Sequence, residues 1–180
     1  MRTLAAYLFI SLDGVVEAPE RFLRNDLYPD SAPLLAETIA GQDAVVLGRK
    51  TWETWSAFWP GSAIEPFATF INSVPKYVAS RSLEPLGWAP STRLRGDLAQ
   101  EIAALKGQPG KTIGVHGSVS LVQALLIAGA LDELRLVLCP VVAGHGRRLL
   151  SREGAPIPLD LQSARTTPRG LQFLIYRPRA

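Results

Sequence analysis

Cysteine is almost missing from this sequence: Cys139 is the only one among 180 residues. A single cysteine cannot form an intrachain disulfide, so we expect the chain to fold without one and to work in the reducing cytoplasm. Its neighbours in Leu136-Val137-Leu138-Cys139-Pro140 are apolar. That setting favours a small core residue over a nucleophile.

Histidine is nearly as scarce, with His116 and His145 alone. Neither stands near a cluster of cysteines and carboxylates, so the sequence predicts no metal site. His145 lies in Gly144-His145-Gly146, and we expect it in a surface turn.

Long hydrophobic runs are also absent. No stretch approaches the roughly 20 apolar residues that a membrane-spanning helix needs. The first apolar run begins at Leu4 and reaches Asp13 without a small-residue cleavage site, so it predicts a strand rather than a signal peptide. The net charge of +3 is only mildly basic, and no Lys/Arg tract is interleaved with aromatic residues. We therefore expect neither a membrane nor a nucleic acid as a partner.

What the sequence does contain is enough apolar material for one core. Residues 1–180 are 47% hydrophobic, which predicts a single domain. Strands and helices are expected to alternate, which is typical of an α/β fold with a mostly parallel sheet and an antiparallel hairpin at its end. The predicted strands are Leu4–Leu12, Ala44–Leu47, Lys76–Ala79, Thr112–Val115, Leu134–Val142, Leu159–Ala164 and Gly170–Arg177. The predicted helices begin at Asp30 or Ser31, Thr51, Phe67, Asp97 and Ser118.

Three of these strands run into short polar segments that suit an anion. They are Gly48-Arg49-Lys50-Thr51, Ser80-Arg81-Ser82 and Gly117-Ser118-Val119-Ser120. Glycine lets an anion approach the backbone, hydroxyls donate hydrogen bonds, and arginine offers a two-pronged donor. A helix that starts at such a segment also presents unpaired N–H groups. One such segment is more typical of helix capping, whereas three in a small domain indicate a dinucleotide.

The order of these segments predicts which phosphate lies where. Open α/β sheets bind ligands at the carboxyl ends of their strands. We expect a pyrophosphate near Gly117-Ser118 and Arg49-Lys50-Thr51, and a ribose 2′-phosphate near Ser80-Arg81. No acidic residue directly follows the third predicted strand, which favours NADPH over NADH. None of the segments is the GxGxxG fingerprint of a Rossmann domain.

Gly48-Arg49-Lys50-Thr51-Trp52-Glu53 resembles the G-R-x-T-[WYF]-E segment of the dihydrofolate reductase superfamily. Other segments resemble one branch of it: the C-terminal reductase domain of the deaminase-reductase of riboflavin synthesis (RibD) and its free-standing relatives. These segments are Ser11-Leu12-Asp13-Gly14, Trp59-Pro60, Gly117-Ser118, Leu131-Asp132-Glu133-Leu134, Pro140-Val141-Val142 and Gly144-His145-Gly146-Arg147-Arg148-Leu149. The resemblance spans residues 3 to 177.

The resemblance implies a three-layer dihydrofolate reductase-like fold and an NADPH-dependent reductase, often a homodimer. The expected reaction is hydride transfer to a small heterocycle, pteridine-like or aminopyrimidine-like. Two alternatives stay open. One is the riboflavin-pathway 5-amino-6-(5-phosphoribosylamino)uracil reductase itself, which needs a basic anchor for a 5-phosphate; Arg21, Arg24 and Arg81 are candidates. The other is a non-catalytic nucleotide-binding module.

The substrate side departs from the dihydrofolate reductase pattern. Those enzymes carry a carboxylate on the first helix, and the matching position falls near Ala32, so dihydrofolate is not the expected substrate. Asp13 follows an apolar strand, and in the resembled family this region faces the substrate. It is the candidate catalytic proton donor and substrate contact, although Asp-Gly pairs equally often bond their own turn. Trp59, beside Pro60, is the candidate ring lining the substrate pocket.

Two structural questions stay open at this stage. Superfamily members often carry a cis Gly-Gly peptide where this chain has His116-Gly117. The strand Leu134–Val142 suits either the centre of a sheet or a subunit contact, and the resemblance favours a homodimer.

Overall fold

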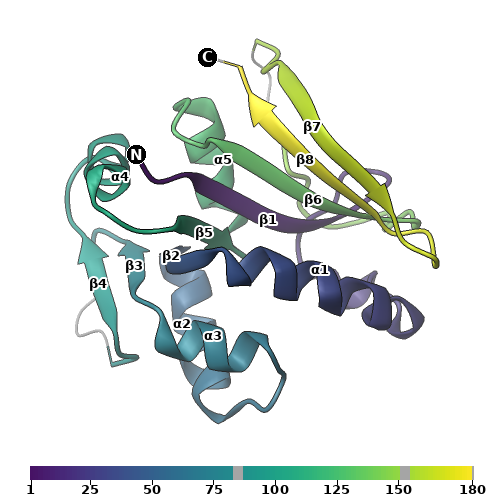
Figure 1. Ribbon diagram of the computed structural model, residues 1–180, viewed down its shortest axis with the longest axis horizontal. Helices are drawn as coiled ribbons and strands as arrows, with labels where there is room; N and C mark the ends of the chain where they lie inside the picture. Colours follow the sequence, from purple (N-terminus) through teal and green to yellow (C-terminus); the bar gives the residue numbers. More distant parts are fainter. Residues whose placement is uncertain (83–86, 151–154, 180) are drawn as a thin grey trace.

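The computed structural model describes residues 1–82, 87–150 and 155–179, and it shows one eight-stranded sheet between two layers of helices (Figure 1). The strand order is β4-β3-β2-β5-β1-β6-β8-β7. The strands are β1 (Leu4–Ser11), β2 (Gln42–Gly48), β3 (Lys76–Ala79), β4 (Ser91–Leu94), β5 (Thr112–His116), β6 (Glu133–Cys139), β7 (Leu159–Thr166) and β8 (Gln172–Pro178). The helices are α1 (Tyr28–Ala40), α2 (Arg49–Phe58), α3 (Phe67–Ser73), α4 (Leu98–Gly107) and α5 (Val119–Ile127).

The first six strands pair in parallel, so their carboxyl ends meet at one edge of the sheet. β8 returns antiparallel beside β6, and β7 pairs with β8 to complete the hairpin. This confirms the predicted dihydrofolate reductase-like α/β architecture, with a mostly parallel sheet and an antiparallel finish.

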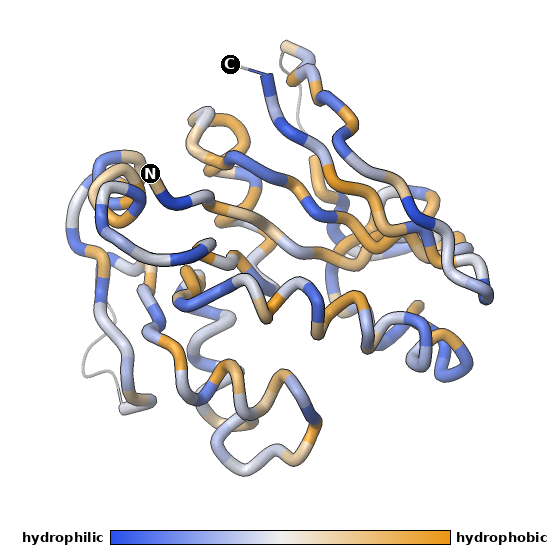
Figure 2. Tube along the Cα trace, viewed as in Figure 1, coloured by the Kyte–Doolittle hydropathy of each residue, from blue (hydrophilic) through white to orange (hydrophobic). Residues whose placement is uncertain are grey.

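The strand at the centre of the sheet has buried residues on both faces, because helices cover both sides. Leu4, Ala6 and Leu8 of β1 pack in the same cluster as residues of α4 and α5. Tyr7 points to the opposite face, where it packs with Leu34 of α1. The helices α2 and α3 cover the same face as α1, through a third cluster that includes Trp52 and Phe67. Figure 2 shows hydrophobic residues gathered in the central strands and on α5.

Helix α1 starts earlier than the capping signal predicts. It begins at Tyr28, and no side chain caps it. The carboxylate of Asp30 instead accepts hydrogen bonds from the backbone N–H of Arg169 at 2.8 Å and from its guanidinium at 2.7 Å. A partner 139 residues away leaves no local trace in sequence. By contrast, the helix predicted to begin at Asp97 does so: Asp97 caps α4 and accepts a hydrogen bond from the backbone N–H of Gln100 at 3.1 Å.

The remaining open questions have plain answers. β6 lies between β1 and β8, so the apolar strand predicted at Leu134–Val142 belongs to the sheet interior. Its backbone edges are therefore not available to a second subunit.

In the described part of the chain the cis peptide bonds are Glu65–Pro66 and Ala89–Pro90, so His116–Gly117 is trans. No helix among the described residues is long and apolar enough to cross a membrane.

Candidate functional site

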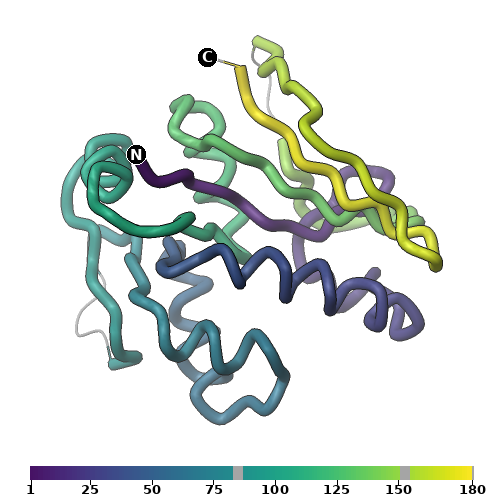
Figure 3. The backbone as a smooth tube through the Cα atoms, viewed as in Figure 1, coloured from purple at the N-terminus to yellow at the C-terminus, as the bar shows by residue number. Residues whose placement is uncertain are grey.

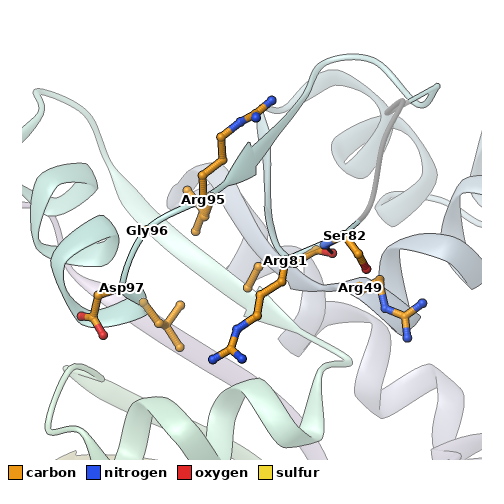
Figure 4. A pocket seen from close by; sticks show the side chains of 10 residues that line it. Arg49, Arg81, Ser82, Arg95, Gly96 and Asp97 are labelled. Atoms are coloured by element: carbon orange, nitrogen blue, oxygen red, sulfur yellow. Dashed lines mark hydrogen bonds between the residues drawn. The ribbon is translucent and has the colours of Figure 1, made fainter.

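A cleft of about 480 Å³ lies at the carboxyl ends of β3 and β4, beside the start of α2 (Figure 4). Its polar and charged lining comes from three separate segments of the chain. These residues are Arg49, Ser80, Arg81, Ser82, Arg95 and Asp97. Two of the three predicted anion-binding segments therefore share one cleft, as expected for strands that end at the same edge.

The three arginines of this cleft differ in their partners and directions. Arg49 donates to Glu53 at 3.0 Å across one turn of α2. The guanidinium of Arg81 makes no hydrogen bond or ion pair with residues 1–82, 87–150 or 155–179. Arg81 and Arg95 point in opposite directions in Figure 4. An incoming anion could therefore bind Arg81 without displacing a carboxylate of the described residues, whereas Arg49 is paired with Glu53.

Arg95, Gly96 and Asp97 are site residues that the sequence interpretation missed. They follow β4, which was not predicted because Ser-Thr-Arg-Leu is short, polar and half-exposed. The signal available in the sequence was the Gly-Asp pair before α4, which marks a helix start. Among the described residues of the lining, Asp97 is the one with an acidic side chain. Its bond to Gln100 commits part of that carboxylate to capping α4.

The first and third predicted segments meet at the starts of α2 and α5. Ser118 Oγ accepts from the backbone N–H of Gly48 at 2.9 Å and donates to Thr51 Oγ1 at 2.9 Å. Thr51 Oγ1 in turn donates to the carbonyl of Gly117 at 3.3 Å. The hydroxyls predicted to donate to phosphate thus join the two segments to each other.

The donors left for an anion at this junction are backbone N–H groups. No side chain caps α2, which follows Gly48, or α5, which follows Ser118. The first N–H groups of a helix have no partner within the helix, and the helix dipole places partial positive charge there. Two uncapped starts held together by Ser118 therefore suit a phosphate pair. Ser118 and Val119 are both buried, each 4% exposed, so the Val119 side chain is not available to a ligand.

Gly117 has no room for a side chain at this junction. Its φ is +62°, in the left-handed region, and an added Cβ would lie 2.7 Å from Cζ2 of Trp55. The Trp55 ring therefore packs directly on the Gly117 backbone. Lys50, by contrast, is exposed and does not line the arginine cleft, so the adjacent cations Arg49 and Lys50 face different surroundings.

Asp13 lies at the carboxyl end of β1, where its carboxylate anchors a loop. It accepts from Ser11 Oγ at 2.7 Å and from the backbone N–H groups of Ala143 at 2.8 Å and Gly144 at 2.9 Å. These hydrogen bonds, with Ser11 first, lower the pKa of the Asp13 carboxyl to about 2. The group is ionised at neutral pH and has no proton to give, so its contacts fit a structural role better than proton transfer.

Replacing Asp13 by asparagine tests this anchoring role. The new amide would retain one acceptor but lose the charge that strengthens the bonds to Ala143 and Gly144, so we expect faster amide exchange of those two N–H groups. The measurement is hydrogen exchange followed by mass spectrometry or NMR at pH 7. Unchanged exchange at both amides would contradict the anchor. Below pH 3.8 the same stabilisation is lost in the wild type as the carboxylate is protonated toward pH 2.

Trp59 belongs to a group of aromatic rings under α2 and α3. Its ring centroid lies 4.8 Å from that of Phe67 and 5.8 Å from that of Trp55. The Phe67 ring also contacts His116, with centroids 5.4 Å apart. Trp59 Nε1 is buried and has no hydrogen-bond partner among the described residues. Trp59 is thus mainly a packing residue here, with one unused donor.

His116 lies at the carboxyl end of β5, where it is 3% exposed. Its Nε2 is 2.8 Å from Oε1 of Gln42. Burial and then the nearby Arg135 charge lower the pKa of His116 to about 4, so its ring is neutral at pH 7. Within the described residues, no group of three or more histidine, cysteine, aspartate or glutamate side chains could hold a metal ion.

Comparisons with known proteins agree with this fold. The RibD C-terminal domain family model matches residues 2–173. The uncharacterized protein YyaP of Bacillus subtilis (strain 168) is 28% identical over 97% of this chain and 94% of its own. A crystal structure from Shewanella sp. PV-4, described as a "putative riboflavin biosynthesis protein", has a TM-score of 0.75 at 19% identity, covering 99% of both chains. Dihydrofolate reductase of Enterococcus faecalis, complexed with NADP(H), has a TM-score of 0.67 at 13% identity, covering 99% of this chain and 97% of its own.

Proposed function

Because the chain belongs to the RibD C-terminal domain family, we propose that it is an NADPH-dependent reductase of a small heterocyclic substrate. The observation that carries the proposal is the cleft in which Arg81 has no partner among the described residues, beside two uncapped helix starts. The Arg81 cleft and the two helix starts would each suit a phosphate group of a dinucleotide. We further propose that it works in the cytoplasm as a homodimer.

The residues of this chain would hold NADPH along the carboxyl edge of the sheet. Arg81, with Ser80 and Ser82, would bind the 2′-phosphate. The N–H groups at the starts of α2 and α5 would bind the pyrophosphate. When bound, NADPH supplies a hydride. Arg49 contributes if it exchanges its bond with Glu53 for one with a phosphate.

On the substrate side the chain would supply a water-excluding aromatic surface that orients the substrate. No general acid is identified there among the described residues. The aromatic group with Trp55, Trp59 and Phe67 packs beside the Gly117 junction. Such rings would hold a planar heterocycle and exclude water from one of its faces. Asp13 is ionised and His116 is buried and neutral, so we propose that water delivers the proton to the substrate.

Titration with NADPH and NADH, followed by quenching of tryptophan fluorescence, tests this function. Trp55 contacts Gly117, so a dinucleotide at the junction should change its emission. We expect NADPH to bind at least tenfold more tightly than NADH, followed by substrate-dependent oxidation of NADPH in a screen of pteridines and aminopyrimidines. Binding of neither dinucleotide would overturn the proposal, and binding without any turnover would favour a nucleotide-binding module.

Arg81→Ala isolates the 2′-phosphate contact. We expect NADPH affinity to fall roughly 10- to 150-fold, the equivalent of ~1.5–3 kcal/mol for a hydrogen bond to a charged group. NADH affinity should hardly change, because it lacks that phosphate. Arg177→Ala is the matched control, since it removes an equal charge from an exposed position on β8, outside the cleft lining. Equal losses in the two variants would mean that Arg81 acts only through general electrostatics.

A further inference from the structure

The two edges of the sheet are β4 and β7, and they differ in length and composition. β4 has four residues and follows Pro90, and a very short edge strand limits pairing with another chain. β7 has eight residues, with neither proline nor lysine among them. Within the described residues β7 pairs on one side only, with β8, and Figure 1 shows it on the outer side of the hairpin. Backbone N–H and C=O groups along its other side are therefore open to a further strand.

One face of β7 continues an apolar surface of the sheet. The strand register places Leu134 of β6 beside Tyr176 of β8, and Tyr176 beside Leu161 of β7. Leu134 is buried in the cluster that α4 and α5 cover, whereas Leu159 and Leu161 are 38% and 54% exposed. The apolar face thus extends past its covering helices to the outer edge of the sheet. Exposed apolar side chains at an open strand edge are typical of an interaction surface.

The middle of β7 contains one extra residue. The pairing with β8 shifts by one residue after Leu161, which makes Gln162 a bulge. Side chains alternate between the faces of a strand, and the extra residue shifts this alternation by one. Leu161 and Ala164 consequently lie on one face of the sheet, and Asp160 and Arg165 lie on the other.

This alternation makes β7 complementary to a second copy of itself. If two copies pair antiparallel around a two-fold axis at the bulge, Asp160 lies opposite Arg165 of the partner subunit, and Leu161 lies opposite Ala164 of the partner subunit. Each pair shares one face, so a charge meets its opposite and an apolar side chain meets another. The two-fold axis repeats both pairs. In a strand without the bulge, Asp160 and Arg165 would lie on opposite faces and could not pair in this way.

Both charged residues have free hydrogen-bonding atoms for such a contact. Arg179 binds Oδ1 of Asp160 through Nε at 2.7 Å and also through Nη2, while Oδ2 accepts no hydrogen bond from the described residues. Arg165 donates from Nη2 to Glu37 at 2.7 Å, and its Nε and Nη1 have no acceptor in the described part of the chain. The Asp160 and Arg165 side chains are 39% and 47% exposed. They can therefore pair between subunits without breaking these bonds.

We propose that two copies of this chain pair along the outer edge of β7, antiparallel and in the register that joins Asp160 to Arg165 of the partner subunit. This inference rests on the proposed homodimer and names its interface. The two sheets then form one continuous sheet, and the exposed apolar faces at Leu159 and Leu161 meet across the axis. A second copy fits better than an unrelated strand, because the charge near each end of β7 matches the charge near the opposite end of the same sequence.

Charge reversal tests this pairing. In size-exclusion chromatography with light scattering, the wild type should have the mass of two 19.5-kDa chains. Asp160→Arg and Arg165→Asp each place like charges opposite each other at both symmetric contacts, so each should raise the dissociation constant of the dimer about tenfold or more. An equal mixture of the two variants again has opposite charges at both contacts and should form a mixed dimer. Lys111→Asp is the matched control, since it reverses a charge at an exposed position before β5, and it should leave the dimer unchanged.

The outcomes separate this inference from the proposed function. Recovery of a dimer in the mixture shows that the single variants are folded, and circular dichroism checks this independently. A dimer that resists both reversals, or a mixture that stays monomeric, overturns the β7 interface and leaves a homodimer through another face. A monomeric wild type overturns the homodimer as well. NADPH affinity, measured by fluorescence, should be equal in the wild type and the variants, so absence of NADPH binding in the wild type reports on the reductase proposal alone.

Discussion

Gly117→Ala should lower the free energy of unfolding by about 2–5 kcal/mol. Two costs add at this position. A residue with a Cβ in the left-handed conformation costs ~1–2 kcal/mol, and forcing extra atoms into a packed site costs ~1–3 kcal/mol. The second cost arises because the new Cβ would lie 2.7 Å from Cζ2 of Trp55.

Gly129→Ala is the matched control for this prediction. Gly129 has a φ of +63°, almost equal to the +62° of Gly117, but nothing lies within 4 Å of a Cβ placed there. It should therefore cost only the conformational part, ~1–2 kcal/mol. Urea denaturation of both variants measures the difference. If the two lose equal stability, the Trp55 contact is not rigid. Gly117→Ala should also weaken NADPH binding, since it displaces the start of α5, and Gly129→Ala should not.

Acidification from pH 6.5 to pH 4 should destabilise the protein by on the order of 3 kcal/mol through His116 alone. The folded pKa of His116, about 4, is lower than its usual 6.5. The unfolded chain therefore binds more protons between these values, and stability falls as pH falls through that window. The physical cause is that a charged imidazolium at 3% exposure would lose its hydration and lie near Arg135.

His116→Gln removes this titration while keeping a polar side chain opposite Gln42. Denaturation at pH 6.5, 5.5 and 4.5 should give a much flatter pH dependence in the variant, whatever its stability at pH 6.5. His145→Gln is the matched control, since it removes the other histidine, at an exposed position. Measurements stop at pH 4.5 because the carboxyls of Asp13, Glu17 and Asp30 have lowered pKa values and titrate at lower pH. A wild-type slope in His116→Gln would show that another group controls the acid transition.

Buried strands were predictable because their side chains are apolar on both faces. β1, β2 and β5 are nearly continuous runs of buried residues, and such runs are what a parallel sheet covered by helices requires. β4 was missed for the opposite reason. It is an edge strand with a single buried residue, Leu94, so its pairing to β3 depends on backbone bonds that any sequence can make.

That the predicted segments lie at one edge of the sheet was predictable from sequence, but their contacts were less so. Strand ends carrying Gly, Ser and Arg identified the carboxyl edge, which the structure brings together. Local sequence could not show that Ser118 and Thr51 bond to each other across 67 residues. Nor could it show that Asp13 reaches Ala143, 130 residues away. Hydroxyls and carboxylates take whichever donor the tertiary fold brings near, so their roles depend on the whole chain.

The central position of the first strand has a consequence for synthesis on the ribosome. Figure 3 shows β1 running through the middle of the sheet, and it pairs only with β5 and β6 among the described strands. About a hundred residues separate Ser11 from Thr112, which at ~5–20 residues per second takes roughly 5–20 s to translate. During that interval eight mostly apolar residues have two open hydrogen-bonding edges. Nascent β1 therefore remains without a strand partner until β5 emerges.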